Sequence, residues 1–279
     1  MKRFLDSKRI REFELHLRNE ERSAATIEKY LHDVRTFLTF AGENEITKQT
    51  VLDYKNKLGD SYAVASANSM IAAINCFFRF CDWHDLCIKQ FKMQRMIYCP
   101  EEKELTRAEY FRLLAAANAK KNERLSLIIQ TICGTGIRVS ELQYVTVEAL
   151  ARGEATVNCK GKSRRIFIVH ELKKRLLRYA KAQHITTGTV FVTRGGNPVS
   201  RNTIWKEMKA LCKQANVPPS KVFPHNLRHL FARTFCGIEK DIAKLADILG
   251  HASINTTRIY IVTTGAEHKR KMEHMKLIL

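Results

Sequence analysis

The longest stretch of the chain without a charged residue runs from Ser61 to Phe78. A run of this length is either a membrane span or a helix buried in a protein core. Polar residues recur along it at Ser66, Asn68, Ser69 and Asn75. The stretch therefore predicts a buried helix, from about Tyr62 to Cys81, inside a globular domain.

The segments before this helix also carry a helical repeat. Ser23 is placed to cap a helix and Gly42 to end it. Between them the i, i+3, i+4, i+7 pattern is followed by Ile27, Tyr30, Leu31, Val34, Phe37 and Leu38. A shorter helix is expected over Thr47–Leu58, with Gly59 as its stop. We therefore predict an all-helical domain over residues 1–97.

The charge of the chain points to an anionic partner. Lys and Arg number 48 against 28 Asp and Glu, a formal net charge of +20. A surplus of this size attracts polyanions, and nucleic acid is the first partner to consider. An anionic membrane surface is the alternative, but no single amphipathic segment gathers the basic residues as a membrane-binding helix does.

Two features of the composition bear on the compartment. No segment joins a basic start to an apolar core and a cleavage site, so nothing indicates secretion. The eight cysteines are scattered without a C-x-x-C pair, which favours a reduced compartment and argues against a zinc site. We expect a cytoplasmic protein without a zinc site.

The apolar period is lost over the charged stretch from Lys89 to Glu104. We predict an interdomain linker at residues 98–104 and a second domain over residues 105–279. Thr106 and Glu109 have the spacing of a capping box, in which a hydroxyl and a carboxylate satisfy the first free amides of a helix.

The second domain is predicted to be mainly helical with one small β-hairpin. A buried helix over Leu125–Ile132 is halted by the turn Gly134-Thr135-Gly136, and helix resumes over Ile137–Tyr144. The β-branched runs Ala155–Cys159 and Arg165–Val169 flank a basic turn and predict the hairpin. The fold class expected for the whole chain is mainly α with this small β element.

His225 and Arg228 stand three residues apart where a helix is expected to begin. This spacing makes them neighbours on one helix face. A guanidinium directs two donors onto one phosphate, while an imidazole beside it donates or accepts a proton. The pair suits phosphate chemistry, although one such pair is a weak signal alone.

Further motifs along the chain resemble those of the tyrosine recombinases, the phage integrase and Xer-type proteins. In chain order they are Gly134-Thr135-Gly136-Ile137-Arg138-Val139-Ser140-Glu141-Leu142, the Lys160 hairpin, His225-x-x-Arg228-His229, Leu249-Gly250-His251 and Tyr260. Tyr260 follows His251 by nine residues, which matches the family's separation. The resemblance covers roughly residues 105–265. The N-terminal domain is similar to the family's SAM-like core-DNA-binding domain in size and helical pattern.

Two arginines suit the binding of a phosphate. Arg138 and Arg228 are permanently charged and can pair bidentately with phosphate oxygens. The alternative for Arg138 is a salt bridge with Glu141, one turn away, which can also orient the arginine in a supporting role. The resemblance implies that Lys160 protonates the leaving 5′ oxygen. Lys162 is the alternative for that role. For the whole segment, the alternative is a solvated basic turn that includes Arg164 and Arg165.

The resemblance also implies roles for the histidines and for a tyrosine. His225 is expected to transfer protons, His251 to donate a hydrogen bond to phosphate and His229 to have a supporting, structural role. Tyr260 is the expected nucleophile. A phenol with a pKa of about 10 needs a base or a cationic pocket to attack at neutral pH, and a helix tyrosine packed by its ring is the alternative.

The resemblance implies transesterification of DNA through a 3′-phosphotyrosyl enzyme, for integration, excision, inversion or resolution. This chemistry requires no metal and no cofactor, and it implies a nucleoid-associated protein. The implied partners are double-stranded DNA with paired half-sites and a homotetramer on synapsed DNA, with an accessory directionality protein as a further candidate. The resemblance implies that the tail Ala266–Leu279 docks on a neighbouring protomer, and packing of its apolar stripe on its own domain is the alternative. An Xer-like enzyme without an arm-site-binding domain is favoured, and a mobile-element integrase stays open. The alternatives are a type IB topoisomerase and a catalytically silent DNA-binding relative.

Overall fold

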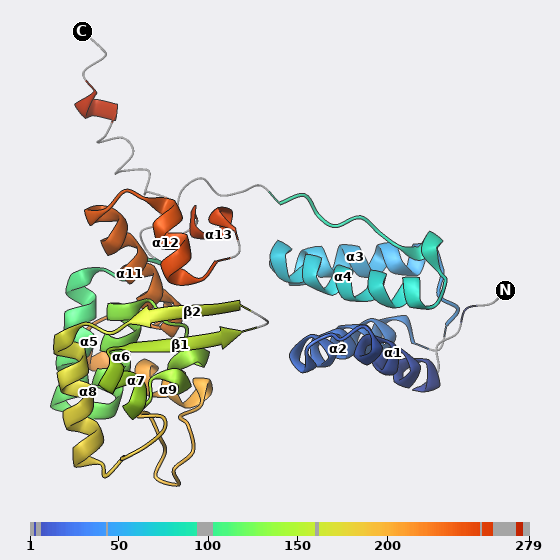
Figure 1. Cartoon of the computed structure of the whole chain (residues 1–279). Helices are drawn as coiled ribbons and strands as arrows, with labels where there is room; N and C mark the ends of the chain where they lie inside the picture. Colours follow the sequence, from blue (N-terminus) through green and yellow to red (C-terminus); the bar gives the residue numbers. More distant parts are fainter. Residues whose placement is uncertain are drawn as a thin grey trace. The chain divides into compact units, whose positions relative to one another are not determined.

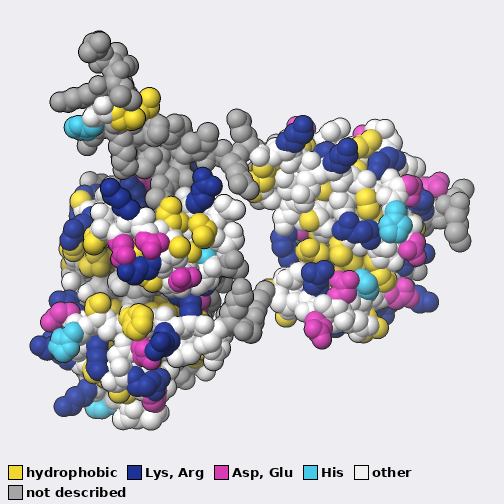
Figure 2. Space-filling model, turned by 45° about the horizontal axis from the view of Figure 1, so that its top comes forward, with side chains coloured by type: hydrophobic (Ala, Val, Ile, Leu, Met, Phe, Trp, Pro, Cys, Tyr) yellow, Lys and Arg dark blue, Asp and Glu magenta, His cyan; other side chains and the backbone are white. Residues whose placement is uncertain are grey.

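The computed structural model describes residues 3, 7–42, 44–93, 103–159, 162–251, 253–258 and 272–275. The chain divides into two compact units, Met1–Arg95 and Met96–Leu279, each with its own hydrophobic core (Figure 1). On the face of each unit seen in Figure 2, Lys and Arg side chains are spread widely among acidic ones. Within the described residues, no helix combines the length and the apolar character that crossing a membrane requires.

The first unit is built from amphipathic helices. In Figure 1, α1 lies beside α2 and α3 beside α4, and α2 also packs on α4. The bounds are α1 Ser7–Asn19, α2 Ala24–Ala41, α3 Lys48–Ser61 and α4 Val64–Phe80, followed by the 3₁₀ helix η1 His84–Leu86. The predicted apolar stripes face inward and are buried at Leu31, Val34, Phe37, Ile74, Phe77 and Phe78.

Local capping explains where these helices end. At the start of α2 the Ser23 side chain accepts the N–H of Thr26, and Gly42 ends the helix at φ 64°, both as predicted. The prediction that Gly59 ends α3 is wrong, because the helix continues to Ser61. A Cβ at position 59 would lie 3.2 Å from the Phe91 ring. This glycine therefore makes room for packing and does not end the helix.

Two asparagines of α4 bind an extended segment that follows η1. Asn68 Oδ1 accepts the N–H of Phe91 at 2.8 Å, and Asn68 Nδ2 donates to the Phe91 carbonyl at 3.0 Å. Asn75 makes the same pair of bonds with the backbone of Ile88, at 3.0 and 2.8 Å. The side chains thus satisfy backbone groups as a neighbouring strand would. Residues 98–102 lie outside the described residues, so the predicted linker and the domain limits beside it stay predictions.

Replacing Asn68 by alanine should destabilise the first unit by about 2 kcal/mol, because two hydrogen bonds worth about 1 kcal/mol each are lost. Urea unfolding of the full chain, followed by the fluorescence of Trp83, measures this change. The other tryptophan, Trp205, is replaced by phenylalanine in all samples, since the sequence has 2 tryptophans. The exposed Gln49→Ala is the matched control. Equal unfolding midpoints for Asn68→Ala and this control would contradict the prediction.

The second unit is mainly helical with one two-stranded antiparallel sheet, which confirms the predicted fold class. Its helices and strands are α5 Arg107–Ala119, α6 Glu123–Thr135, η3 Val139–Tyr144, α7 Val147–Arg152, β1 Glu154–Cys159, β2 Lys162–Phe167, α8 His170–Ala182, α9 Arg201–Lys209, α10 Cys212–Ala215, η4 Pro219–Lys221, α11 Pro224–Ile238, α12 Ile242–Leu249 and α13 Ile254–Arg258. The predicted capping box of Thr106 and Glu109 opens α5. Ser200 caps α9, and α10 follows as a separate short helix.

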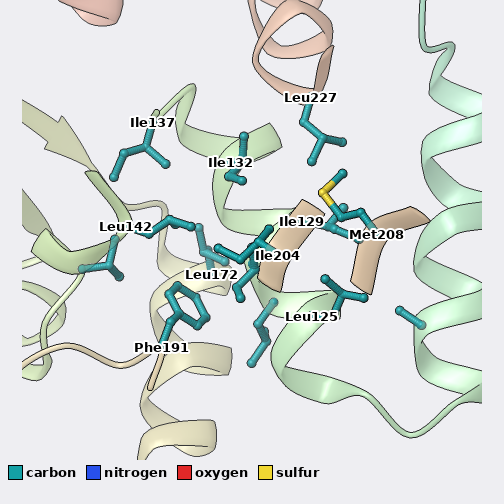
Figure 3. Packing of buried hydrophobic residues seen from close by; sticks show 14 of the residues in the cluster. Leu125, Ile129, Ile132, Ile137, Leu142, Leu172, Phe191, Ile204, Met208 and Leu227 are labelled. Carbon is teal, nitrogen blue, oxygen red and sulfur yellow. The ribbon is translucent and has the colours of Figure 1, made fainter. Parts of the chain in front are cut away.

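Helix α6 lies at the centre of this unit. It packs against α5, α8, α9 and α11, and its side chains Ile128, Ile129 and Ile132 are fully buried. Figure 3 shows Ile129 and Ile132 among apolar side chains that come from the surrounding elements. Because α6 is enclosed in this way, the turn between α6 and η3 is held in a fixed position.

The predicted hairpin is confirmed, and its register decides which side chains face the core. Val157 pairs with Arg164, and Thr156 pairs with Arg165. Successive residues of a strand point to opposite faces of the sheet. Val157 is buried, so Arg164 lies on the inner face of β2 and Arg165 on the outer one. The second strand begins at Lys162, earlier than predicted.

Candidate active site

Among the predicted site residues that the structure describes, Arg228 is the most deeply buried. It lies in the first turns of α11, and 1% of its surface is exposed. Its Nη1 donates to the carbonyl of Gly136 at 2.5 Å, and its Nη2 donates to the carbonyl of Leu249 at 2.7 Å. These carbonyls lie at the C-terminal ends of α6 and α12, where the helix dipole favours a cation. The buried guanidinium is therefore stabilised by two helix ends.

Gly136 allows the end of α6 to pack closely against α11 and α12. It ends α6 with φ 66°, in the left-handed region that glycine adopts without strain. A Cβ at this position would come within 2.6 Å of the Phe231 ring and 2.9 Å of Leu249. The prediction that the Gly134-Thr135-Gly136 turn halts the helix at Ile132 needs correction, because α6 continues through Gly134 to Thr135.

Arg138 and Glu141 form the predicted salt bridge. Arg138 Nη1 donates to Glu141 Oε1 at 2.8 Å, and the Arg138 backbone N–H donates to Oε2 at 2.9 Å. Arg138 Nη2 also reaches the Gly250 carbonyl at 3.3 Å. Burial acts to raise the pKa of Glu141, but the hydrogen bonds from Arg138 and the charge of Arg164 outweigh it and lower that pKa. Glu141 is therefore a buried carboxylate that orients Arg138.

Arg164 joins the same carboxylate from strand β2. Its Nη2 donates to Glu141 Oε2 at 2.5 Å, and its Nη1 donates to the Ile248 carbonyl at 2.6 Å. The interpretation of Arg164 as part of a solvated basic turn is therefore wrong. The successive carbonyls of Ile248, Leu249 and Gly250 thus accept hydrogen bonds from Arg164, Arg228 and Arg138, in that order.

His251 follows Gly250, the C-cap of α12, and lies beside Arg228. Its Nε2 is 2.9 Å from Arg228 Nη2, and its Nδ1 is 2.8 Å from Thr257 Oγ1. A guanidinium has only donors, so Nε2 accepts in this contact and Nδ1 carries the proton toward Thr257. Burial, followed by the charges of Arg228, Arg138 and Arg164, lowers the pKa of His251 to about 4. The imidazole is therefore neutral at pH 7.

His225 and His229 lie one turn apart on α11. Their rings meet edge to face with centroids 4.8 Å apart. Desolvation of the ring and then the charges of Arg228, Arg138 and Arg201 lower the pKa of His225, although the residue as a whole is exposed. Burial, followed by the charges of His225 and Arg228, lowers the pKa of His229 to about 4. Both imidazoles are therefore neutral at pH 7.

A cavity of about 390 Å³ opens beside these groups. Its walls include Arg138, His225 and Arg228 together with Arg201 and Trp205 of α9. The arginines give the cavity a positive lining, which suits an anionic group of phosphate size. Among the described residues, no cluster of His, Cys, Asp or Glu is arranged to hold a metal ion.

The structure brings together most of the predicted site residues: Arg138, Glu141, His225, Arg228, His229 and His251. The side chains of Lys160 and Lys162, and Tyr260 as a whole, lie outside what the structure describes. Sequence reasoning missed the buried Thr257, the burial of Arg164 and the cavity residues Arg201 and Trp205. A threonine near a motif histidine carries no signal of its own. An arginine four residues before a tryptophan on an amphipathic helix also carries no signal of a binding site.

Comparison with known proteins decides the family. The profile of the phage integrase family matches residues 103–266, and that of the phage integrase N-terminal SAM-like domain matches residues 10–84. The chain belongs to the phage integrase family. Its members with similar sequences are tyrosine recombinases, so the resemblance found in the motifs is confirmed.

The similarity to these recombinases extends along the chain. Tyrosine recombinase XerA of Thermococcus kodakarensis is 31% identical, over 96% of this chain and 95% of the relative. Tyrosine recombinase XerD of Halalkalibacterium halodurans is 28% identical, over 93% of this chain and 95% of the relative. The phage integrase family member described here is thus a tyrosine site-specific recombinase, and neither the topoisomerase nor the silent relative is favoured.

Solved structures agree with this assignment. The crystal structure of XerA recombinase has 26% identity and a TM-score of 0.55, covering 98% of this chain and 99% of the other. The structure of a lambda integrase tetramer bound to a Holliday junction has 19% identity and a TM-score of 0.72, covering 91% and 76%. At that identity, the second comparison shows a shared fold.

Two partly buried histidines should make this tyrosine recombinase less stable in acid. His229 and His251 have a pKa of about 4 in the folded chain and about 6.5 when unfolded. Between these values the unfolded state binds more protons, so stability falls as the pH falls from about 6.5 to about 4. Thermal unfolding at pH 7 and pH 5 measures this loss. The loss should be smaller in His229→Gln and unchanged in the exposed control His170→Gln. Equal losses in both variants would refute the prediction.

Proposed function

We propose that this recombinase cuts and rejoins double-stranded DNA at paired half-sites, with Tyr260 as the nucleophile. The observation that carries the proposal is the convergence of Arg138, Arg228 and His251 on the end of α12, beside the cavity that His225 lines. These residues come from separate elements, yet they form one cationic site. Charge stabilisation by such preorganised groups is commonly the largest contribution to catalysis.

The two arginines bind the scissile phosphate in this mechanism. Arg228 is held by two helix ends and Arg138 by Glu141, so both need little reorganisation when DNA binds. Their positive charge stabilises the additional negative charge that develops on the phosphate oxygens during attack.

The histidines act as neutral groups at pH 7. His225 accepts the proton of the Tyr260 hydroxyl as the tyrosine oxygen bonds to phosphorus. The Thr257 hydroxyl can accept from or donate to His251 Nδ1, so it supports either tautomer. When a phosphate oxygen replaces His251 Nε2 as an acceptor of Arg228 Nη2, His251 Nε2 can carry the proton and donate it in a hydrogen bond to that phosphate.

A hairpin lysine completes the cleavage step. Lys160 gives a proton to the 5′ oxygen as the bond between phosphorus and that oxygen breaks. The products are a 3′-phosphotyrosyl enzyme and a free 5′ hydroxyl. Attack by a 5′ hydroxyl from another strand reverses these steps. The phosphotyrosyl bond retains the energy of the broken bond, so this chemistry requires no nucleotide cofactor.

The proposed assembly is a homotetramer on two synapsed DNA sites. Support comes from the shared fold with a lambda integrase tetramer bound to a Holliday junction. The net charge of +20 suits the duplex partner. An accessory directionality protein and a place beside the nucleoid in the cytoplasm belong to the same proposal. The expected docking of the tail Ala266–Leu279 falls mostly on residues outside the described ones.

Tyr260→Phe should abolish covalent capture of DNA, because no other hydroxyl takes the place of the nucleophile. A nicked duplex of the recombination site, which traps the cleaved strand, is incubated with enzyme and run on a denaturing gel. Wild type and the matched control Tyr30→Phe should form a protein–DNA adduct. Tyr260→Phe should bind the same DNA in a gel shift and form none. An adduct from Tyr260→Phe, or none from wild type on bound DNA, would overturn the proposal.

A second experiment decides between the two lysines. Lys160→Ala should slow cleavage by about 100-fold or more, the range expected for loss of a general acid, whereas Lys162→Ala should cleave nearly as wild type does. A substrate with sulfur in place of the bridging 5′ oxygen should restore the Lys160→Ala rate, because a thiolate leaves without protonation. Slow cleavage by Lys162→Ala with near wild-type cleavage by Lys160→Ala would assign the role to Lys162. If the sulfur substrate restores the rate of neither variant, neither lysine is the general acid.

A further inference from the structure

Arg164 and Arg165 are adjacent basic residues of β2 with opposite environments. The side chain of Arg164 is 12% exposed and that of Arg165 is 67% exposed. Arg165 pairs with Glu154 at 3.7 Å, a distance at which an exposed ion pair contributes little. Arg164 instead lies on the inner face of the hairpin, where it contacts the active site.

Arg164 shares its carboxylate with Arg138. Glu141 Oε2 accepts Arg164 Nη2 at 2.5 Å, while Oε1 accepts Arg138 Nη1 at 2.8 Å. Glu141 is 5% exposed, so its charge depends on these two partners. Without Arg164, the whole charge of the carboxylate would act on Arg138 and would compete with a phosphate for that guanidinium.

Arg164 also holds the end of α12. Its Nη1 donates to the Ile248 carbonyl at 2.6 Å, two residues before Gly250. Gly250 has φ 64°, and a Cβ there would overlap the Arg164 side chain. The Gly250 carbonyl accepts from Arg138, and His251 is the next residue. The Arg164 side chain therefore contacts both Glu141, which orients Arg138, and the end of α12, which precedes His251.

We propose that Arg164 is a positioning residue for strand cleavage, acting through Glu141 on Arg138 and through the end of α12 on His251. It does not touch the phosphate. It sets the distance between the hairpin and the two groups that do, and it limits the attraction of Glu141 for Arg138. This inference rests on the proposed function, since it assigns Arg138 and His251 to the phosphate.

The test compares Arg164→Gln with Arg165→Gln in the full chain. On the nicked duplex with enzyme in excess, Arg164→Gln should slow single-turnover cleavage by about 10- to 100-fold, the range expected when catalytic groups are displaced. Its affinity for the DNA, measured by gel shift, should stay within about threefold of wild type. Arg165→Gln removes the same charge from the outer face and should change neither quantity by more than about twofold.

A neutral substrate separates positioning from a general structural role. A methylphosphonate at the scissile position removes the charge that Arg138 stabilises. The ratio of wild-type to Arg164→Gln rates should therefore be several-fold smaller on this substrate than on the phosphate. A defect of folding would slow both substrates equally. Arg164→Lys keeps a cation for Glu141 but is too compact to serve both partners, and it should give an intermediate rate. It is also the variant to measure if Arg164→Gln does not fold.

The outcomes are distinct. Cleavage by Arg164→Gln within threefold of wild type, or equal slowing of both substrates, would overturn the inference and leave the proposed function intact. If Arg164→Lys is measured instead, the same criteria apply. Failure of the wild-type enzyme to form an adduct on DNA that it binds would overturn the proposed function itself.

Discussion

The site depends on a buried cation that two helices share. Arg228 is almost fully buried, and a guanidinium in that position is costly unless its donors are satisfied. The carbonyls of Gly136 and Leu249 satisfy it from the ends of α6 and α12. Neither helix end can move far without leaving the charge unpaired. The buried arginine therefore fixes the relative position of the two turns that carry Arg138 and His251.

The end of α12 connects Arg228 to the rest of the site. Its successive carbonyls from Ile248 to Gly250 accept hydrogen bonds from arginines of β2, α11 and the turn after α6. This crowding leaves room for only a glycine at position 250. Glu141 supplies the one carboxylate found among these guanidiniums in the described part of the chain. The excess of positive charge suits a site that is completed by an anionic substrate.

Some of the misplaced boundaries have a common physical cause. Gly59 and Gly134 were both expected to stop or interrupt helices, yet α3 and α6 continue through them. A glycine ends a helix only where the backbone takes a positive φ, as at Gly42, Gly136 and Gly250. At Gly59 the missing side chain accommodates Phe91. The position of that ring depends on the asparagine contacts of a segment more than twenty residues away, which no local pattern reports.

The sequence by itself determined the helical class, the hairpin, the caps at Ser23 and Thr106 and the family, because these depend on local spacing and on motifs of distinctive residues. It also predicted that Arg138, His225, Arg228 and His251 belong to one site. Only the tertiary structure decided that Arg164 is buried while Arg165 is not, and that Thr257 partners His251. Those outcomes depend on strand register and on contacts between distant segments. Adjacent arginines look alike in a sequence, and folding places them on opposite faces of a strand.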